Sequence, residues 1–224
     1  MRSVAAYVRA APFTFAYLAL LLATALALGA SGERARTDFM RWSSTNLDHL
    51  GHEPLRVLLA SALWLQGFSV AFWVLLFAVV LASVEQALGT RRFVGLFAAG
   101  HVGATLLVAL GLWLGIRAGA FSPRLEDAVD VGVSYGFVAA AAAFTFLLDR
   151  RARAPYAAAL LAYLLARLAL GHTFSDAGHL VALGIGYGLA WTGFADPRRA
   201  RARTILEACP PAPYRHPAHS SRTR

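Results

Sequence analysis

Long apolar runs, separated by shorter polar segments, are the main pattern of this sequence. A helix that crosses a bilayer needs about 20 predominantly apolar residues. Runs of about that length predict six membrane-spanning helices, over residues 11–30, 67–88, 93–115, 130–148, 156–171 and 175–194. The pattern therefore predicts an all-α fold, that of a polytopic membrane protein built as a six-helix bundle.

The segments between and beyond these spans complete the predicted organisation. Residues 57–88 form an apolar run too long for one span, and Gln66-Gly67-Phe68-Ser69 marks a break inside it. The part before the break, residues 57–65, is predicted to be a short interfacial or re-entrant piece. Residues 1–10 form a short N-terminal segment before a membrane domain over 11–194. Residues 195–224 are rich in Arg and Pro and have no apolar periodicity, which predicts a disordered tail.

Composition excludes most soluble classes of protein. Of the 224 residues, 58% are hydrophobic and only 15% are charged, against about 25% charged in a typical soluble domain. A soluble fold of this length cannot bury so much apolar surface, since roughly a third of the unfolded chain's surface stays exposed after folding. A soluble enzyme, a DNA-binding domain and a disordered protein are therefore excluded. The single cysteine, Cys209, also excludes an intramolecular disulfide and a cysteine-based zinc site.

The positive charge is distributed as a membrane topology signal. All 21 basic residues are Arg, and they lie in clusters between the apolar runs. With a cytoplasmic N-terminus, 14 of them fall on the cytoplasmic side and six on the other, with Arg167 inside the fifth span. This asymmetry predicts that both termini lie in the cytoplasm, which requires an even number of spans. We expect the membrane to be the plasma membrane. We expect the tail arginines to bind anionic lipid, and we expect no nucleic-acid partner.

Two polar residues at similar depth in the predicted spans are candidates for chemistry. Ser134 lies near the outer end of the fourth span, and His179 lies near the outer end of the sixth. Small residues flank both, which permits the close helix approach that a Ser–His hydrogen bond requires. A serine hydroxyl is a weak nucleophile, and a neutral histidine is able to accept its proton. The two residues form a candidate catalytic dyad, although a lone Ser in a membrane helix usually bonds a backbone carbonyl.

Charged residues near the dyad have simpler predicted roles. Asp130 and Asp176 each precede a dyad residue, and helix N-capping is favoured over a catalytic role for both. We expect Arg167 to extend to the outer surface, with an ion pair to Asp176 or Asp130 as the alternative.

Neither a metal nor a cofactor is predicted. His172, Asp176 and His179 would share one face of a continuous helix, but Gly171 is expected to end the fifth span and so to interrupt that helix. His101, in the middle of the third span, is expected to make a packed polar contact rather than to bind a ligand.

Several motifs resemble those of the rhomboid intramembrane serine proteases. Gly132-Val133-Ser134 resembles the G-x-S motif of the fourth span in that family, and residues 179–186 resemble its histidine motif in the sixth. Residues 56–63 resemble the short segment before the second span, and residues 85–93 resemble the acidic residue, glycine and basic turn that end it. The resemblance covers about residues 55–195. The sequences around Ser134 and His179 are similar to those of a divergent rhomboid-like group associated with actinobacteria.

The resemblance implies a role for each matching residue. Ser134 would be the nucleophile and would supply one oxyanion donor from its backbone N–H, and His179 would be the general base and then the acid. Ser69 and Trp73 stand where the family usually has the H-x-x-x-N pattern of the second span. These two residues and Gly132 are therefore weak candidates for oxyanion stabilisation or substrate positioning.

Other positions also depart from the family pattern. Tyr135 replaces the glycine that usually follows the serine, and Val138 replaces the aromatic residue that usually supports the histidine ring. The Trp-Arg pair of the first loop is present only in reversed order, as Arg41-Trp42.

Two functions follow from the resemblance and its departures. The first is hydrolysis of single-span membrane proteins by the Ser134–His179 dyad, without a cofactor. The second is a catalytically inactive rhomboid-like protein that binds or sorts transmembrane segments, since the oxyanion pattern is weakened. A small transporter or channel subunit is disfavoured, because the spans have no clear inverted repeat and few intramembrane charges.

Cysteine accessibility mapping tests the predicted topology. In a Cys209→Ser background, Met40→Cys should react with a membrane-impermeant thiol reagent in intact cells, because residues 31–55 are predicted to lie outside. Native Cys209, in the tail, is the matched control and should react only after lysis. Labelling at position 40 only after lysis would contradict the arginine-based topology.

Overall fold

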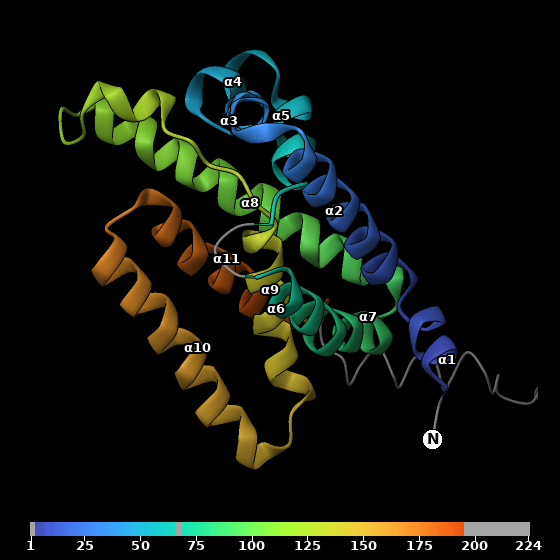
Figure 1. The fold of residues 1–224 in the computed structure, drawn as a ribbon. Helices are drawn as coiled ribbons and strands as arrows, with labels where there is room; N and C mark the ends of the chain where they lie inside the picture. The colour runs from blue at the N-terminus through green and yellow to red at the C-terminus, as the bar shows by residue number, and fades with distance from the viewer. Residues whose placement is uncertain (1–2, 66–68, 195–224) are drawn as a thin grey trace, which may run out of the picture.

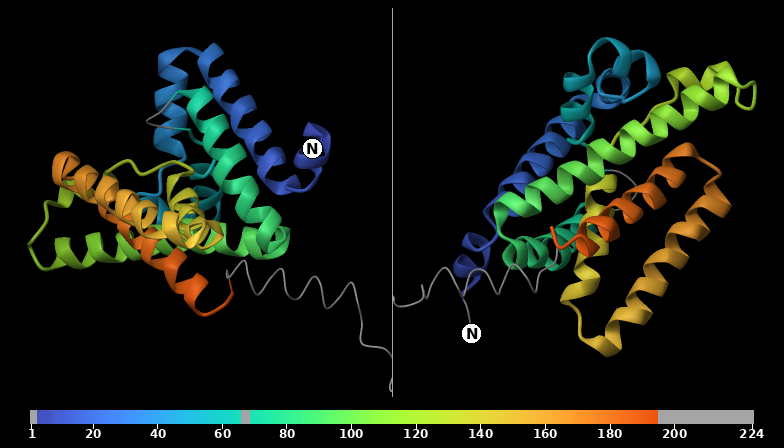
Figure 2. Two further views of the ribbon diagram at one scale, coloured as in Figure 1. Left: turned by 90° about the horizontal axis from the view of Figure 1, so that it is seen from below. Right: turned by 180° about the vertical axis from the view of Figure 1, so that it is seen from behind.

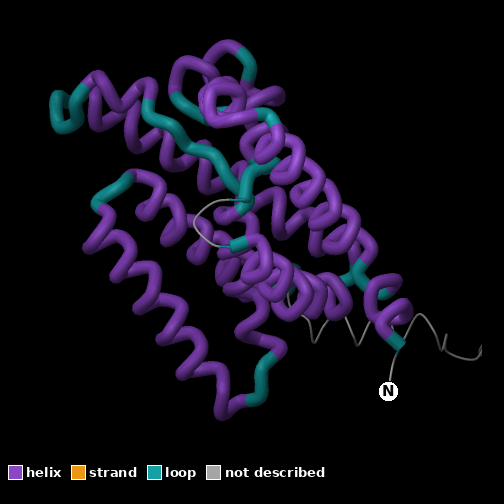
Figure 3. The backbone as a smooth tube through the Cα atoms, viewed as in Figure 1, coloured by secondary structure: helices purple, strands orange, loops and turns teal. Residues whose placement is uncertain are grey.

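The computed structural model describes residues 3–65 and 69–194, and within these ranges the chain forms helices and turns without a strand (Figure 3). Four helices are long and apolar enough to cross a membrane: α2 (Pro12–Ala30), the continuous run of α6 (Val70–Leu76), η1 (Phe77–Leu81) and α7 (Ala82–Leu88), α8 (Thr90–Arg117) and α10 (Arg150–Gly171). The shorter α9 (Ser134–Phe144), continued by η3 (Thr145–Leu147), and α11 (Phe174–Trp191) complete an all-α, six-helix membrane bundle (Figure 1). The predicted break at residues 66–69 falls partly outside the described residues, and so does the predicted tail at 195–224.

Short helices gather at the two ends of the bundle. α3 (Gly32–Trp42), α4 (Leu47–His52), α5 (Pro54–Ser61) and η2 (Pro123–Asp127) lie at one end, and α1 (Val4–Arg9) and the turn between α9 and α10 lie at the other (Figure 1). The short helix α5 overlaps the piece predicted over 57–65, but it begins earlier, at Pro54, and ends at Ser61. At this end the Arg56 guanidinium lies 4.6 Å from the Trp42 ring centroid and donates to the Trp42 carbonyl. Trp42 therefore pairs with Arg56 rather than with its neighbour Arg41.

The predicted start of the fourth span at residue 130 is wrong, because α9 begins at Ser134. The residues just before it are extended and bond to another part of the chain. The Gly132 N–H donates to the Ser61 carbonyl at 2.8 Å, and the Val133 N–H donates to the Trp64 carbonyl at 3.1 Å. Gly132 has φ +130, which is incompatible with a helix. Ser134 is therefore the first residue of its helix and does not lie inside it.

Small residues let α8, α9 and α11 pack at close range in the middle of the bundle (Figure 2). Ala139 of α9 is fully buried, and a Cβ added at Gly186 of α11 would lie 2.4 Å from its carbonyl oxygen. A Cβ added at Gly100 of α8 would lie 2.3 Å from the Ala139 Cβ. Close backbone approach of this kind is how membrane helices gain packing energy without a hydrophobic driving force. It confirms the prediction that small residues bring the helices of the dyad together.

A buried carboxylate ties the first two spans together. Glu85 of α7 is 1% exposed and accepts the backbone N–H groups of Phe13 at 3.0 Å and Thr14 at 2.7 Å. Its Oε1 also accepts the Thr90 hydroxyl at 2.8 Å. These N–H groups belong to the first turn of α2, where they have no partner within the helix. Glu85 therefore acts as the N-terminal cap of α2 from a neighbouring helix.

We expect Glu85→Gln to destabilise the protein by about 1–3 kcal/mol, because an amide N–H2 would replace one acceptor oxygen opposite buried donors. Thermal unfolding of the purified chain in detergent measures the change. The exposed Glu126 provides a matched control, since Glu126→Gln removes a charge without removing a buried acceptor. Equal unfolding temperatures for the two variants would contradict the capping role.

Candidate active site

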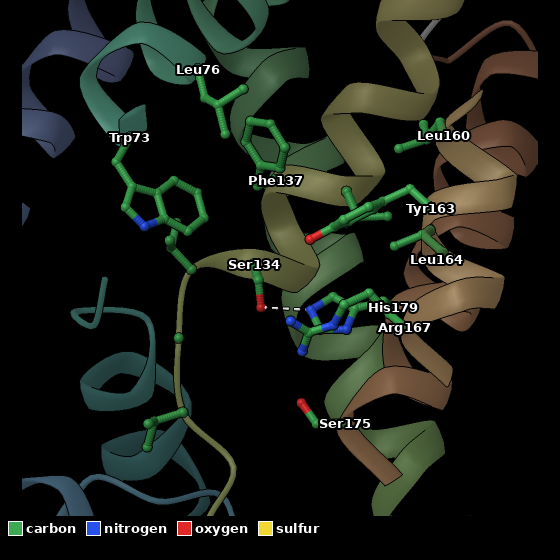
Figure 4. A pocket seen from close by; sticks show the side chains of 14 residues that line it. Trp73, Leu76, Ser134, Phe137, Leu160, Tyr163, Leu164, Arg167, Ser175 and His179 are labelled. Carbon is green, nitrogen blue, oxygen red and sulfur yellow. Dashed lines mark hydrogen bonds between the residues drawn. The ribbon is translucent and has the colours of Figure 1, made fainter. Parts of the chain in front are cut away.

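Ser134 and His179 meet across α9 and α11. The His179 Nε2 lies 2.9 Å from the Ser134 Oγ, within hydrogen-bond distance (Figure 4). Ser134 begins α9, and His179 lies in the second turn of α11. Both side chains are partly exposed to one cavity. The structure therefore brings together the two residues that the sequence singled out.

The cavity beside this pair has a volume of about 190 Å³. Four helices, α6, α9, α10 and α11, and the segment before α9 contribute to its wall. The lining is mostly apolar, and its polar side chains are those of Ser134, His179, Ser175, Arg167, Tyr163 and Trp73 (Figure 4). A cavity with an apolar wall and a few convergent polar groups is the usual form of a binding or active site.

Gly132 lies beside Ser134 at the cavity wall. A Cβ added at Gly132 would lie 3.8 Å from the Ser134 Oγ and 4.0 Å from the Ser134 nitrogen. No side chain caps the N-terminus of α9, whose N-cap residue is Val133. The first-turn N–H groups of a helix lack intrahelical partners and carry the positive end of its dipole. The backbone beside the Ser134 hydroxyl is therefore suited to receive a negatively charged oxygen.

Asp130 does not cap α9, which corrects the sequence prediction. Its Oδ2 accepts the Tyr135 hydroxyl at 3.1 Å, and its Oδ1 accepts the Ser175 hydroxyl at 3.1 Å. Its backbone N–H donates to the Ser44 Oγ at 3.0 Å, and its carbonyl accepts the Thr45 N–H at 2.9 Å. The reason is the extended segment before Ser134, which separates Asp130 from the helix end and turns it toward α11 and the first loop.

Tyr135 contacts His179 directly. The two ring centroids are 5.1 Å apart and the rings are inclined by 71°, an edge-to-face arrangement. Sequence reasoning identified Tyr135 only as a departure from a family pattern and missed this contact. Two departures from the family pattern could have indicated the contact. An aromatic residue, Tyr135, replaces the usual glycine, and the buried Val138 replaces the usual aromatic residue.

Asp176 is buried and paired with Arg167. Its Oδ1 accepts Arg167 Nη2 at 3.0 Å, and its Oδ2 accepts the Thr173 hydroxyl at 2.6 Å. Thr173 is the N-cap of α11, with its Oγ1 accepting the Asp176 N–H at 3.1 Å. Asp176 is therefore in the first turn of α11 and is not the cap itself. Of the two alternatives for Arg167, the ion pair is the one formed, although half of the Arg167 side chain is exposed.

Of the three candidates for oxyanion stabilisation or substrate positioning, two line the cavity and one does not. Ser69 is the N-cap of α6, with its hydroxyl accepting the Phe72 N–H at 3.3 Å, and it is not part of the cavity wall. Trp73 is 3% exposed and lines the cavity, with its ring 5.7 Å from that of Phe137. Gly132 lines the cavity beside Ser134. Trp73 and Gly132 are thus close to the dyad, and Ser69 has a structural partner of its own.

The other histidines lie apart from the dyad. His101 is 5% exposed and its Nε2 lies 3.0 Å from the Leu58 carbonyl, which confirms the packed polar contact. His172 has φ 51 at the C-terminal end of α10 and is exposed, so residues 172–179 are not one continuous helix. Within the described ranges, no group of three or more His, Cys, Asp or Glu side chains is arranged to hold a metal ion.

We expect Gly132→Ala to destabilise the protein by about 1–3 kcal/mol, because φ +130 is strained for any residue with a Cβ. Thermal unfolding in detergent measures the change. Gly111→Ala is the matched control, since Gly111 lies inside α8 with open space around its Cβ position. Alanine is favoured over glycine in a helix by up to about 1 kcal/mol. An unfolding temperature of Gly132→Ala that matches the control would show that the segment tolerates a side chain.

Comparisons with known proteins agree with this architecture. The family model described as rhomboid-like protein matches residues 6–195, which is most of the chain and includes all helices from α2 to α11. No curated protein and no solved structure gives a significant match. On the extent of the family match, the chain belongs to the rhomboid family as a rhomboid-like, polytopic membrane protein.

Proposed function

We propose that this rhomboid-like protein is an intramembrane serine endopeptidase that cleaves single-span membrane proteins with a Ser134–His179 dyad. The observation that carries the proposal is the 2.9 Å contact between the Ser134 Oγ and the His179 Nε2, made at the wall of a cavity between helices. A nucleophile and a base within hydrogen-bond distance are the minimum arrangement for covalent hydrolysis.

The dyad would work as follows. With the ring proton on Nδ1, the His179 Nε2 accepts the Ser134 proton while Oγ forms a bond to the substrate carbonyl carbon. His179 then gives that proton to the leaving amine as the C–N bond breaks, which leaves an acyl-enzyme. A water molecule attacks the acyl carbon and gives a proton to Nε2, and the Oγ–C bond breaks as Oγ regains a proton.

The tetrahedral intermediate carries a negative oxygen that needs donors. The Ser134 backbone N–H, at the uncapped N-terminus of α9, is one donor in the proposed mechanism. The Trp73 indole, on the cavity wall, is the candidate for a second. Loss of one such donor costs about 10²–10³-fold in rate, so this part of the site limits the turnover that we expect.

The cavity also supports a membrane-embedded substrate. Trp73 and Leu76 of α6 line one side, and Leu160, Tyr163 and Leu164 of α10 line another. The most apolar window of α10 is only 6% buried within the structure, which suits a helix that faces lipid. A transmembrane segment that enters between α6 and α10 would reach the dyad without leaving the bilayer. In the same proposal the protein lies in the plasma membrane with both termini cytoplasmic, and its basic tail binds anionic lipid.

The second candidate is a catalytically inactive rhomboid-like protein that binds or sorts transmembrane segments. The observation that favours it is the pair of residues at the usual H-x-x-x-N positions. Ser69 bonds the end of its own helix, and Trp73 is held in a cluster of rings. A site with few oxyanion donors would hold a segment without cutting it at a useful rate.

Variants of the dyad decide between the two functions. Ser134→Ala should abolish cleavage of a single-span reporter and labelling by a fluorophosphonate probe, a loss of about 10³-fold or more. His179→Ala should have the same effect, and the double variant should lose no more, since the two residues act as a unit. Purified protein in detergent or liposomes is suitable for both measurements.

Two substitutions outside the cavity serve as controls. Ser83→Ala changes a half-buried serine of α7, and His52→Ala changes an exposed histidine of α4. Both should keep the wild-type cleavage rate and labelling. Binding of a transmembrane peptide without Ser134-dependent cleavage or labelling, over several substrates, would reject the peptidase and favour the binding role.

A further inference from the structure

We propose that Tyr135 is a positioning residue for His179, and that Gly178 provides the space for its ring. The proposal rests on the proposed function, because it explains how the imidazole is held against Ser134. Tyr135 would act on the substrate only through His179, and it is therefore not a catalytic residue.

The contact between the rings is the first observation. The Tyr135 and His179 centroids are 5.1 Å apart with the ring planes inclined by 71°. The imidazole turns about two side-chain bonds, and its polar contacts are with the Ser134 Oγ and with the Ser175 backbone. An edge-to-face contact with a neighbouring ring further restricts the rotation that would carry Nε2 away from Ser134.

The position of Tyr135 is itself fixed from two sides. Its hydroxyl donates to the Asp130 Oδ2 at 3.1 Å, and the Ser175 Oγ lies 3.3 Å from the same hydroxyl. The Ser175 hydroxyl in turn donates to the Asp130 Oδ1 at 3.1 Å. Tyr135 is 3% exposed and Asp130 is 7% exposed, so the bond between them is shielded from water, whereas Ser175 is half-buried at the cavity wall. The hydroxyl end of the Tyr135 ring is held by Asp130, just before α9, and by Ser175 of α11. The ring is therefore a rigid support for the imidazole.

The lack of a side chain at Gly178 is the second, independent observation. A Cβ added there would lie 2.3 Å from the Tyr135 Oη and 2.5 Å from its Cζ. The ring therefore lies directly over the α11 backbone at the residue before His179. Any side chain at 178 would displace the ring, so residues 135 and 178 form a matched pair.

Histidine NMR tests the proposal without relying on activity. The full chain in detergent micelles, labelled with ¹⁵N-histidine, is compared with Tyr135→Phe and Tyr135→Leu, and His179→Gln assigns the signal. We expect one sharp His179 ring signal in the wild type and in Tyr135→Phe, which keeps the ring. We expect a broadened or shifted signal in Tyr135→Leu, which fills similar volume without an aromatic edge. Tyr187→Leu, a substitution at the far end of α11 where Tyr187 bonds Thr145, is the matched control and should leave the signal unchanged.

A second pair of variants keeps the test decisive if Tyr135→Leu folds poorly. Gly178→Ala should perturb the His179 signal and lower the unfolding temperature when Tyr135 is present. The added methyl should cause little further loss of unfolding temperature in the Tyr135→Leu background, where the ring is gone. An unchanged His179 signal in both Tyr135→Leu and Gly178→Ala would overturn the proposal. Equal perturbation by Tyr135→Phe and Tyr135→Leu would also overturn it, because the hydroxyl network alone would then hold the histidine.

Kinetics link this result to the proposed function. If the wild type cleaves its substrate, Tyr135→Leu should lower kcat by about 10²-fold with little change in KM, as expected for a misplaced base. Tyr135→Phe should lose only a few-fold. A wild type without Ser134-dependent activity would reject the peptidase, while the NMR comparison would still decide whether Tyr135 positions His179. A loss confined to KM would assign Tyr135 to substrate binding and would contradict its positioning role.

Discussion

The hydrogen bonds of Asp130 are the interaction on which the site depends. Its carboxylate accepts hydrogen bonds from Tyr135 of α9 and Ser175 of α11. Its backbone N–H and carbonyl bond to Ser44 and Thr45 of the first loop. These segments are far apart in sequence and carry, or adjoin, both residues of the dyad. A buried carboxylate with each oxygen bonded is stable where an unpaired one would be costly. The position of Ser134 relative to His179 follows from this junction.

The segment before Ser134 shows how a membrane protein accommodates extended backbone. Backbone N–H groups cannot be left unpaired at membrane depth, so irregular segments survive only where protein groups bond them. Gly132 and Val133 donate to the carbonyls of Ser61, the last residue of α5, and of Trp64 in the segment that follows. His101 of α8 lies within bonding distance of the Leu58 carbonyl and holds α5 in turn. The first loop, which contains no residue of the dyad, thereby positions the start of α9.

Much of the architecture could be predicted from the residues alone, because it depends on local physical rules. Apolar runs of spanning length predicted each long helix, although α10 begins at Arg150, before the predicted start at residue 156. Small residues around Ser134 and His179 predicted the close approach of their helices. A weak nucleophile and a base at similar depth in two predicted spans also identified Ser134 and His179 as the candidate dyad. Glu85 was noted from its place at the end of the second span, although its role as the cap of α2 required the neighbouring helix.

Only the tertiary structure decided the details that surround the dyad. The sequence pattern predicted a helix from residue 130, where the apolar run of the fourth span begins. It predicted a capping role for Asp130 because an Asp side chain accepts backbone N–H groups at a helix N-terminus. The bonds of Gly132 and Val133 to the end of α5 and the segment that follows override that local preference and make Ser134 the first helical residue. Tyr135 and Gly178 are 43 positions apart in the chain, and nothing local to either predicts that one ring fills the space above the other. Local periodicity thus determined where the helices run, whereas contacts between distant segments determined what their ends present to a substrate.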